Sequence, residues 1–316
     1  MRDAIWVTGL LLTCGIAGAS SAPLTRGGQF VAVAPHESLF VTQVGPSGGT
    51  PIVILPSLVG SAVAFRRVAQ LLAASHHRVL IIDPLGMGGS PRPRGADYAL
   101  AAQARRGSRA IEQLCTQPAV LIATGVSASI AWRVAAAEPA RVAGVVSIEG
   151  GLVESQATPG LTRLKWMAPL ANTPWGRRLA RHRFRSMLVT GSASSAWITD
   201  STVDSYLAPV VADLPATLHV WSSMAAARDA DSTTSAARRI TQPVRLLVGG
   251  APSARQKSGG VPGREVEQLR ALLRTLQVDT IDGSGWFVHE EQPLAVVRAV
   301  ELLDAAHRVT AGRIPD

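Results

Sequence analysis

The sequence is poor in lysine, cysteine and aromatic residues, and each shortage narrows the possible functions. Lys165 and Lys257 are the only lysines, so the formal net charge of +9 comes from arginine. The chain has no basic stripe alternating with aromatic residues and no nucleic-acid-binding motif, which argues against a nucleic-acid partner. Cys14 and Cys115 are the only cysteines, too few for a cysteine zinc site. We expect neither a metal ion nor a cofactor.

The first 22 residues have the pattern of an export signal. Arg2 precedes an apolar run over residues 4–17 that ends in small residues. This pattern predicts a signal peptide cleaved near Ala19 or Ala22, and hence a periplasmic or secreted protein. An uncleaved membrane anchor and a lipid attached to Cys14 are the alternatives.

Apolar runs and helical patterns alternate along most of the remaining chain. A hairpin is expected over residues 29–44. Buried strands are expected at residues 51–55, 78–82, 119–124, 142–148, 243–248 and 278–281. Helices are expected at residues 62–74, 98–114, 264–276 and 293–309, with a further helix of small residues after Ser129 that ends at residue 137. Such alternation predicts an α/β fold with a mostly parallel, doubly wound sheet and an N-terminal antiparallel hairpin.

Residues 152–240 interrupt this alternation with several helical patterns and no strand. A helical insertion between two strands of a doubly wound sheet lies above the carboxyl ends of the strands, where ligands bind. We therefore predict a core made of residues 28–151 and 241–310 and a helical cap made of residues 152–240. The basic run at residues 177–185 fits either a solvated cap helix or a helix in weak contact with a membrane surface.

One short segment has the pattern of a nucleophile elbow. Gly125-Val126-Ser127-Ala128-Ser129 lies between an apolar strand and a helix of small residues. A serine on a sharp turn between strand and helix exposes its hydroxyl above the sheet, and the usual pattern is G-x-S-x-G. Here serine replaces the last glycine, and it is still small enough to let helix and strand pack closely.

Five further features accompany the elbow in a fixed order, and together with it they resemble the α/β-hydrolase superfamily, in its capped branch of esterases, epoxide hydrolases and haloalkane dehalogenases. The resemblance covers residues 30–303. The features are Pro56-Ser57-Leu58 after an apolar strand, D-P-L-G-M-G-G-S at 83–90, E-P-A-R-V-A-G-V-V at 138–146, the helical insertion, and G-S-G-W-F-V-H-E-E-Q-P at 283–293.

The resemblance implies roles for individual residues. Ser127 corresponds to the nucleophile, and the backbone N–H groups of Leu58 and Ala128 correspond to the oxyanion hole. No carboxylate follows the strand that ends at residue 248, the usual position of the catalytic acid. Glu149 occupies a position that part of the superfamily uses for this acid. Its alternative role is that of a loop carboxylate bound by nearby backbone N–H groups.

The position of the general base departs from the family pattern. The family motif G-x-G-H ends in the catalytic histidine, whereas this chain has Trp286 there. An indole N–H only donates a hydrogen bond, so Trp286 can line a pocket but cannot accept the serine proton. His289 lies three residues further on and could serve as the base if the loop is rearranged. The other histidines are expected to be surface or structural residues.

Three functions remain open at this point. The first is a serine hydrolase that uses Ser127, His289 and Glu149 on a small apolar ester-like substrate. The second is a non-catalytic relative whose capped pocket binds a hydrophobic small molecule or a protein partner. The third is chemistry that needs no histidine base, such as isomerisation in a shaped apolar pocket.

Overall fold

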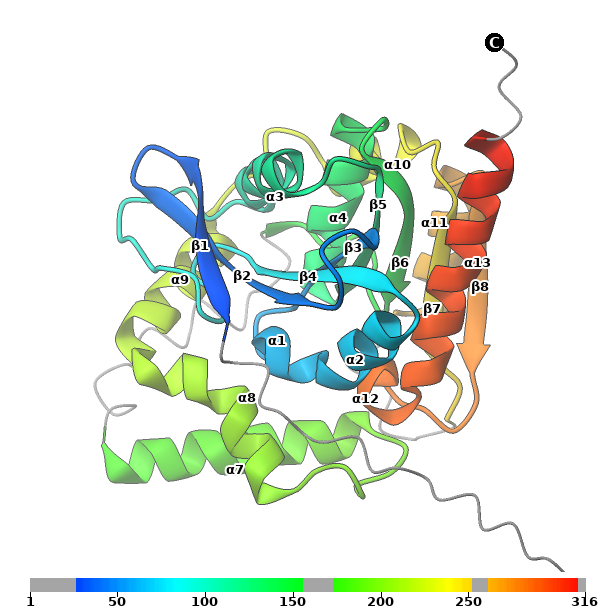
Figure 1. Cartoon of the computed structure of the whole chain (residues 1–316). Helices are drawn as coiled ribbons and strands as arrows, with labels where there is room; N and C mark the ends of the chain where they lie inside the picture. Colours follow the sequence, from blue (N-terminus) through cyan, green and yellow to red (C-terminus); the bar gives the residue numbers. More distant parts are fainter. Residues whose placement is uncertain (1–26, 156–172, 252–260, 312–316) are drawn as a thin grey trace, which may run out of the picture.

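The computed structural model describes residues 27–155, 173–251 and 261–311, which form an eight-stranded sheet with helices on both faces (Figure 1). The strands are β1 (Gly28–Ala34), β2 (Glu37–Val44), β3 (Thr50–Leu55), β4 (His77–Asp83), β5 (Ala119–Thr124), β6 (Val142–Ile148), β7 (Val244–Gly249) and β8 (Leu276–Ile281). The helices are α1 (Ser61–Ala64), α2 (Arg66–Ala74), α3 (Leu100–Leu114), α4 (Val126–Ala137), α7 (Pro174–Gly191), α8 (Asp200–Ala212), α9 (Leu214–Ala226), α10 (Thr233–Arg238), α11 (Gly263–Leu272), α12 (Val288–Glu291) and α13 (Pro293–Ala311).

The strand order is β1-β2-β4-β3-β5-β6-β7-β8. Strand β2 pairs antiparallel with β1 and with β4, and every other pairing is parallel. The predicted fold class is therefore confirmed, including the N-terminal hairpin. His36 turns this hairpin with φ of 62°, between strand ends that pair Ala34 with Glu37.

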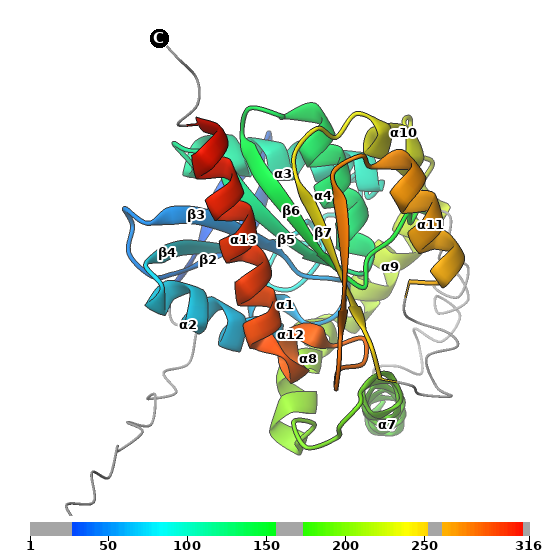
Figure 2. The same cartoon turned by 90° about the vertical axis from the view of Figure 1, so that its right-hand side faces the viewer.

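Helices α2 and α13 cover one face of the sheet, and α3, α4, α10 and α11 cover the other (Figure 2). Strands β3 and β5 run between these layers and are buried almost throughout. Their side chains point alternately to the two faces, so the apolar core divides into two clusters. Ile52, Ile54 and Ile122 lie in the cluster beneath α2 and α13, whereas Val53 and Leu121 lie in the cluster beneath α4.

The described part of residues 152–240 contains only helices. Helices α7 and α8 lie beyond the end of the sheet toward which β8 points (Figure 1). Phe184 and Leu188 of α7 and Tyr206 of α8 join the cluster beneath α2 and α13. Helix α10 differs from these, because it packs against α4 and α11 on the face of the sheet.

Several predicted helices have different bounds in the structure, and the helix expected after Ser129 begins at Val126. The helix expected over residues 62–74 is divided into α1 and α2 at Phe65, whose φ of −107° interrupts the helical backbone. The helix expected over residues 264–276 ends at Leu272, because Leu276 pairs with Val244 as the first residue of β8. The predicted signal peptide and Cys14 lie outside the described residues. Within the described ranges, no helix combines the length and apolar character that a bilayer span requires.

Candidate functional site at the strand-to-helix turn

Gly125 is the single residue between β5 and α4. Its φ of 51° and ψ of −126° belong to a region that residues with a side chain adopt only under strain. The Gly125 N–H donates to the Ile148 carbonyl at 3.3 Å, which fixes the turn beside the end of β6. The sharp turn of a nucleophile elbow is therefore present, and Gly125 adopts it without strain because it has no side chain.

Ser127, the predicted nucleophile, is the second residue of α4. Its side chain is fully buried, and its Oγ donates a hydrogen bond of 2.6 Å to the Pro56 carbonyl. The hydroxyl thus ties the loop after β3 to the first turn of α4. Ser127 lies two residues past the sharp turn, and its hydroxyl faces this loop.

The two predicted oxyanion donors differ in their surroundings. The Ala128 N–H donates to the Gly125 carbonyl at 3.1 Å, so it is engaged within the helix start. The Leu58 N–H lies in the loop after β3 and donates to no acceptor among the described residues, and the same is true of the Val126 N–H. If Gly125 marks the elbow, Val126 is the residue that follows the nucleophile position, and its N–H takes the role assigned to Ala128.

Glu149 follows β6 and is buried, with φ of 47°. Its carboxylate accepts hydrogen bonds from the N–H groups of Gly249 at 2.6 Å and Val261 at 2.9 Å. Burial raises the pKa of this carboxyl, and the two backbone donors partly oppose that shift. These contacts are those of the alternative role, a carboxylate that holds the loop after β7.

Trp286 lies against the end of the cap helix α7. Its backbone N–H donates to the Gly191 carbonyl at 2.7 Å, and its Nε1 is buried without a hydrogen-bond partner in the described structure. Neither Gly191 nor Gly285 has room for a Cβ, because the added atom would strike the Trp286 ring or the Gly191 backbone. The G-S-G-W segment therefore packs directly on the cap.

His289, the predicted substitute base, lies in α12 within aromatic surroundings. Its ring stacks on Phe65 with centroids 4.7 Å apart and meets the edge of Phe287 at 6.2 Å. Its Nδ1 is buried, and no described residue bonds to it. Burial lowers the pKa of His289 from 6.5 to about 3, so the imidazole stays neutral at ordinary pH. Within the described ranges, no hydrogen bond joins any two of Ser127, His289 and Glu149.

The neutral, buried His289 predicts a specific pH dependence of stability. Between pH 6.5 and 3 the unfolded chain binds a proton at this position that the folded chain does not, so stability falls as the pH falls. The slope is about 1.4 kcal/mol per pH unit, or about 2–3 kcal/mol between pH 6.5 and 4.5. We expect His289→Phe, which preserves the stacking on Phe65, to remove this part of the acid sensitivity in urea titrations at the two pH values.

The exposed His182 of α7 provides the matched control for this experiment. His182→Phe should keep the wild-type difference in unfolding free energy between pH 6.5 and 4.5. An unchanged acid sensitivity in His289→Phe would contradict a buried, neutral imidazole at position 289.

The predicted basic run forms α7. Arg181 and Arg185 form ion pairs with Asp200 at the start of α8, at 3.0 Å and 2.8 Å, and Arg181 also pairs with Asp204. Trp175, in the first turn of α7, is 64% exposed. Part of the basic charge is thus neutralised within the cap.

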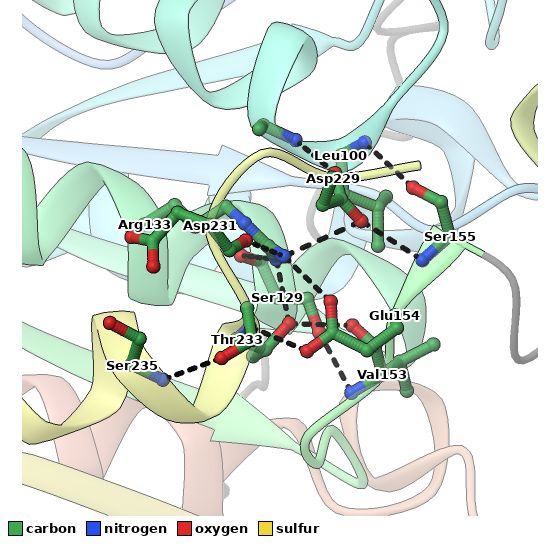
Figure 3. Close-up of polar contacts among 12 residues, drawn as sticks. Leu100, Ser129, Arg133, Val153, Glu154, Ser155, Asp229, Asp231, Thr233 and Ser235 are labelled. Carbon is green, nitrogen blue, oxygen red and sulfur yellow. Dashed lines mark hydrogen bonds and ion pairs between the residues drawn. The ribbon is translucent and has the colours of Figure 1, made fainter. Parts of the chain in front are cut away.

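Arg133 of α4 is the centre of a buried polar network that the sequence did not suggest (Figure 3). Its guanidinium forms ion pairs with Glu154 at 2.8 Å and Asp229 at 3.4 Å, and it donates to Thr233 Oγ1 at 2.7 Å. Glu154 and Asp229 belong to the chain segments that leave β6 and approach α10. The network therefore ties both ends of the insertion to the helix that follows the elbow.

A surface cavity of about 470 Å³ lies between α3, α4 and the approach to α10, away from the elbow turn. Arg105, Arg109 and Arg239 line it together with Glu112 and Asp231. The three arginines are paired with nearby carboxylates, which leaves little unbalanced charge for an ionic ligand. Across the described ranges, no three side chains of the metal-ligating types gather closely enough to hold a metal ion.

Comparison with known proteins gives consistent results. A family model described as the alpha/beta hydrolase fold matches residues 50–196. The "Putative carbamate hydrolase RutD" of Variovorax paradoxus (strain S110) is 31% identical over 104 residues, which is 33% of this chain but only 39% of that protein.

Two solved structures illustrate the likeness of the fold. A thermophilic esterase from Thermogutta terrifontis is 18% identical with a TM-score of 0.68, covering 88% of this chain and 99% of the esterase. The epoxide hydrolase CorEH is 15% identical with a TM-score of 0.69, covering 88% of this chain and 98% of that one. Sheet order, elbow turn and the matched family model agree, and this chain has the α/β-hydrolase fold.

Proposed function

We propose that this protein is a non-catalytic member of the superfamily that binds a small hydrophobic acyl compound at the elbow. The observation that carries the proposal is the backbone of Gly125. This residue has the backbone conformation of the sharp turn on which the nucleophile of the fold sits. A glycine there brings no hydroxyl or thiol to the reaction centre.

The surroundings of the other predicted catalytic residues support the same proposal. Ser127 uses its hydroxyl to hold the Pro56 carbonyl, and Glu149 uses its carboxylate on two backbone N–H groups. Trp286 replaces the histidine of the family motif and cannot accept a proton. Loss of one triad member typically lowers the rate by several orders of magnitude.

Two features support an acyl compound as the ligand. The N–H groups of Leu58 and Val126 donate to no acceptor among the described residues, which suits a carbonyl or carboxylate oxygen. The solved structures with this fold include an esterase, a lipase and a thioesterase domain, whose names all indicate acyl substrates. The signal-like N-terminus supports action outside the cytoplasm.

A fluorophosphonate probe tests the loss of catalysis, because it labels serines with an activated hydroxyl. We expect the wild-type protein to remain unlabelled while it binds decanoate in calorimetry without hydrolysing ethyl decanoate. Ser127→Ala provides the matched variant. Labelling of the wild type that disappears in Ser127→Ala would support the serine hydrolase instead and overturn the proposal.

A further inference from the structure

Ser57 faces the place from which the side chain of the nucleophile is missing. A Cβ added to Gly125 would lie 3.0 Å from Ser57 Oγ and 3.7 Å from Ser57 Cβ. Ser57 belongs to the loop between β3 and α1 and is half-buried. The space in front of Gly125 is thus bounded by a hydroxyl from the loop after β3, the strand next to β5.

The position of Ser57 is fixed by its neighbour. Pro56 precedes it, and the Pro56 carbonyl accepts the buried hydrogen bond from Ser127 Oγ. Strained backbone at Ser61, with φ of 43°, follows in the same loop. Ser127 therefore affects the site indirectly, because its hydrogen bond to the Pro56 carbonyl holds the loop that carries Ser57.

We propose that Ser57 replaces the nucleophile as the hydroxyl that contacts the ligand, and that Ser127 is its positioning residue. This inference rests on the proposed function. The Ser57 hydroxyl would donate a hydrogen bond to an oxygen of the bound acyl group, whose other oxygen meets the N–H groups of Leu58 and Val126. With Trp286 in place of a base, Ser57 binds the ligand and forms no covalent bond with it.

The juxtaposition is tested directly by the double variant Ser57→Cys/Gly125→Cys. A Cβ–Cβ separation of 3.7 Å lies within the usual range of disulfides, so the two cysteines should form one in air. Intact mass would fall by two hydrogens, and maleimide would not react with either thiol. Gly125→Cys/Ser129→Cys is the control that should stay reduced, because Ser129 faces Gly151 and Val153. Failure of the first pair to cross-link in folded protein would overturn the inference.

Calorimetry with decanoate tests the role of Ser57 in binding. We expect Ser57→Ala to weaken binding about tenfold or more, since one hydrogen bond to a carboxylate is lost. Ser127→Ala should weaken it to a smaller extent, and Ser186→Ala, on the exposed surface of α7, should leave it unchanged. Equal affinity of wild type and Ser57→Ala would overturn the inference and leave the proposed function standing. Absence of binding by the wild type would overturn both.

Discussion

Substituting Gly125→Ser together with Trp286→His is expected to produce a protein that fluorophosphonate labels at position 125. The rate of labelling should exceed that of the wild type by about 10³-fold or more, because a nucleophile and a base are restored together. Each single variant should remain close to the wild type, since neither group acts without the other. Peptide mass spectrometry identifies the labelled residue.

The backbone geometry explains why the serine belongs at position 125. The hydroxyl of a serine on this strained turn would stand beside the N–H groups of Val126 and Leu58, which donate to no acceptor among the described residues. Holding a side chain in this conformation costs about 1–3 kcal/mol, so a lower melting temperature is expected in both variants that carry the Gly125→Ser substitution. The Ser57 side chain must also move slightly, because the new Cβ lies 3.0 Å from its Oγ.

Two controls make this experiment decisive. Adding Ser127→Ala to the double variant should leave the label at position 125 and lower the labelling rate only modestly, because Ser127 bonds the Pro56 carbonyl and acts only by holding the loop after β3. Adding Ala251→Asp supplies the carboxylate that is missing after β7 and should raise the rate further. Labelling at Ser127, or equal rates in wild type and double variant, would contradict the assignment of Gly125 as the nucleophile position.

The fold could be predicted from the sequence because its signals are local. Strands β3, β5 and β6 are continuous apolar runs that both faces of the sheet bury, and glycine or proline lies close to their ends. The boundary between α11 and β8 could not be predicted. Leu276 continues the helical pattern, and only its pairing with Val244 places it in a strand.

The elbow pattern fits the sequence in two registers, which differ in their central residue. Residues 123–127 and 125–129 both have the spacing of small residues that the G-x-S-x-G pattern requires. The sequence favoured the second, because only there does the central position carry a hydroxyl. The structure shows that β5 extends to Thr124, which pairs with Ile148, so the sharp turn falls on Gly125. The strand end at residue 124 was predicted, but the start of the helix at Val126, directly after Gly125, was not.

The Arg133 network was not predicted because its members are distant in the sequence. Arg133 appears in a helix of small apolar residues, where an arginine normally reaches the surface. Its partners Glu154, Asp229 and Thr233 come from segments that meet it only in the folded chain. A sequence pattern records periodicity along one element, and it contains no signal for contacts of this kind.

Arg133→Met is expected to destabilise the protein by about 3–5 kcal/mol, the typical cost of removing one partner from a buried ion pair. Asp229 has an almost fully buried carboxylate and, among the described residues, would keep only the backbone donors Ala101 and Ser155. Glu154 is 36% exposed and can turn to solvent, so most of the loss should come from Asp229. Urea unfolding followed by circular dichroism measures the change.

Arg141→Met provides the matched control for Arg133→Met. Arg141 lies just beyond α4 and forms ion pairs with Glu112 at 3.2 Å and Glu138 at 3.8 Å, but its side chain is 40% exposed. Exposed pairs of this kind contribute at most about 1 kcal/mol to stability. Each of the two arginines forms ion pairs with two carboxylates, so the comparison tests the effect of burial. Arg133→Lys should also lower the free energy of unfolding. A single ammonium group cannot contact both carboxylates and Thr233 at once, as the planar guanidinium does. Equal losses in Arg133→Met and Arg141→Met would show that the network does not hold the ends of the insertion on α4.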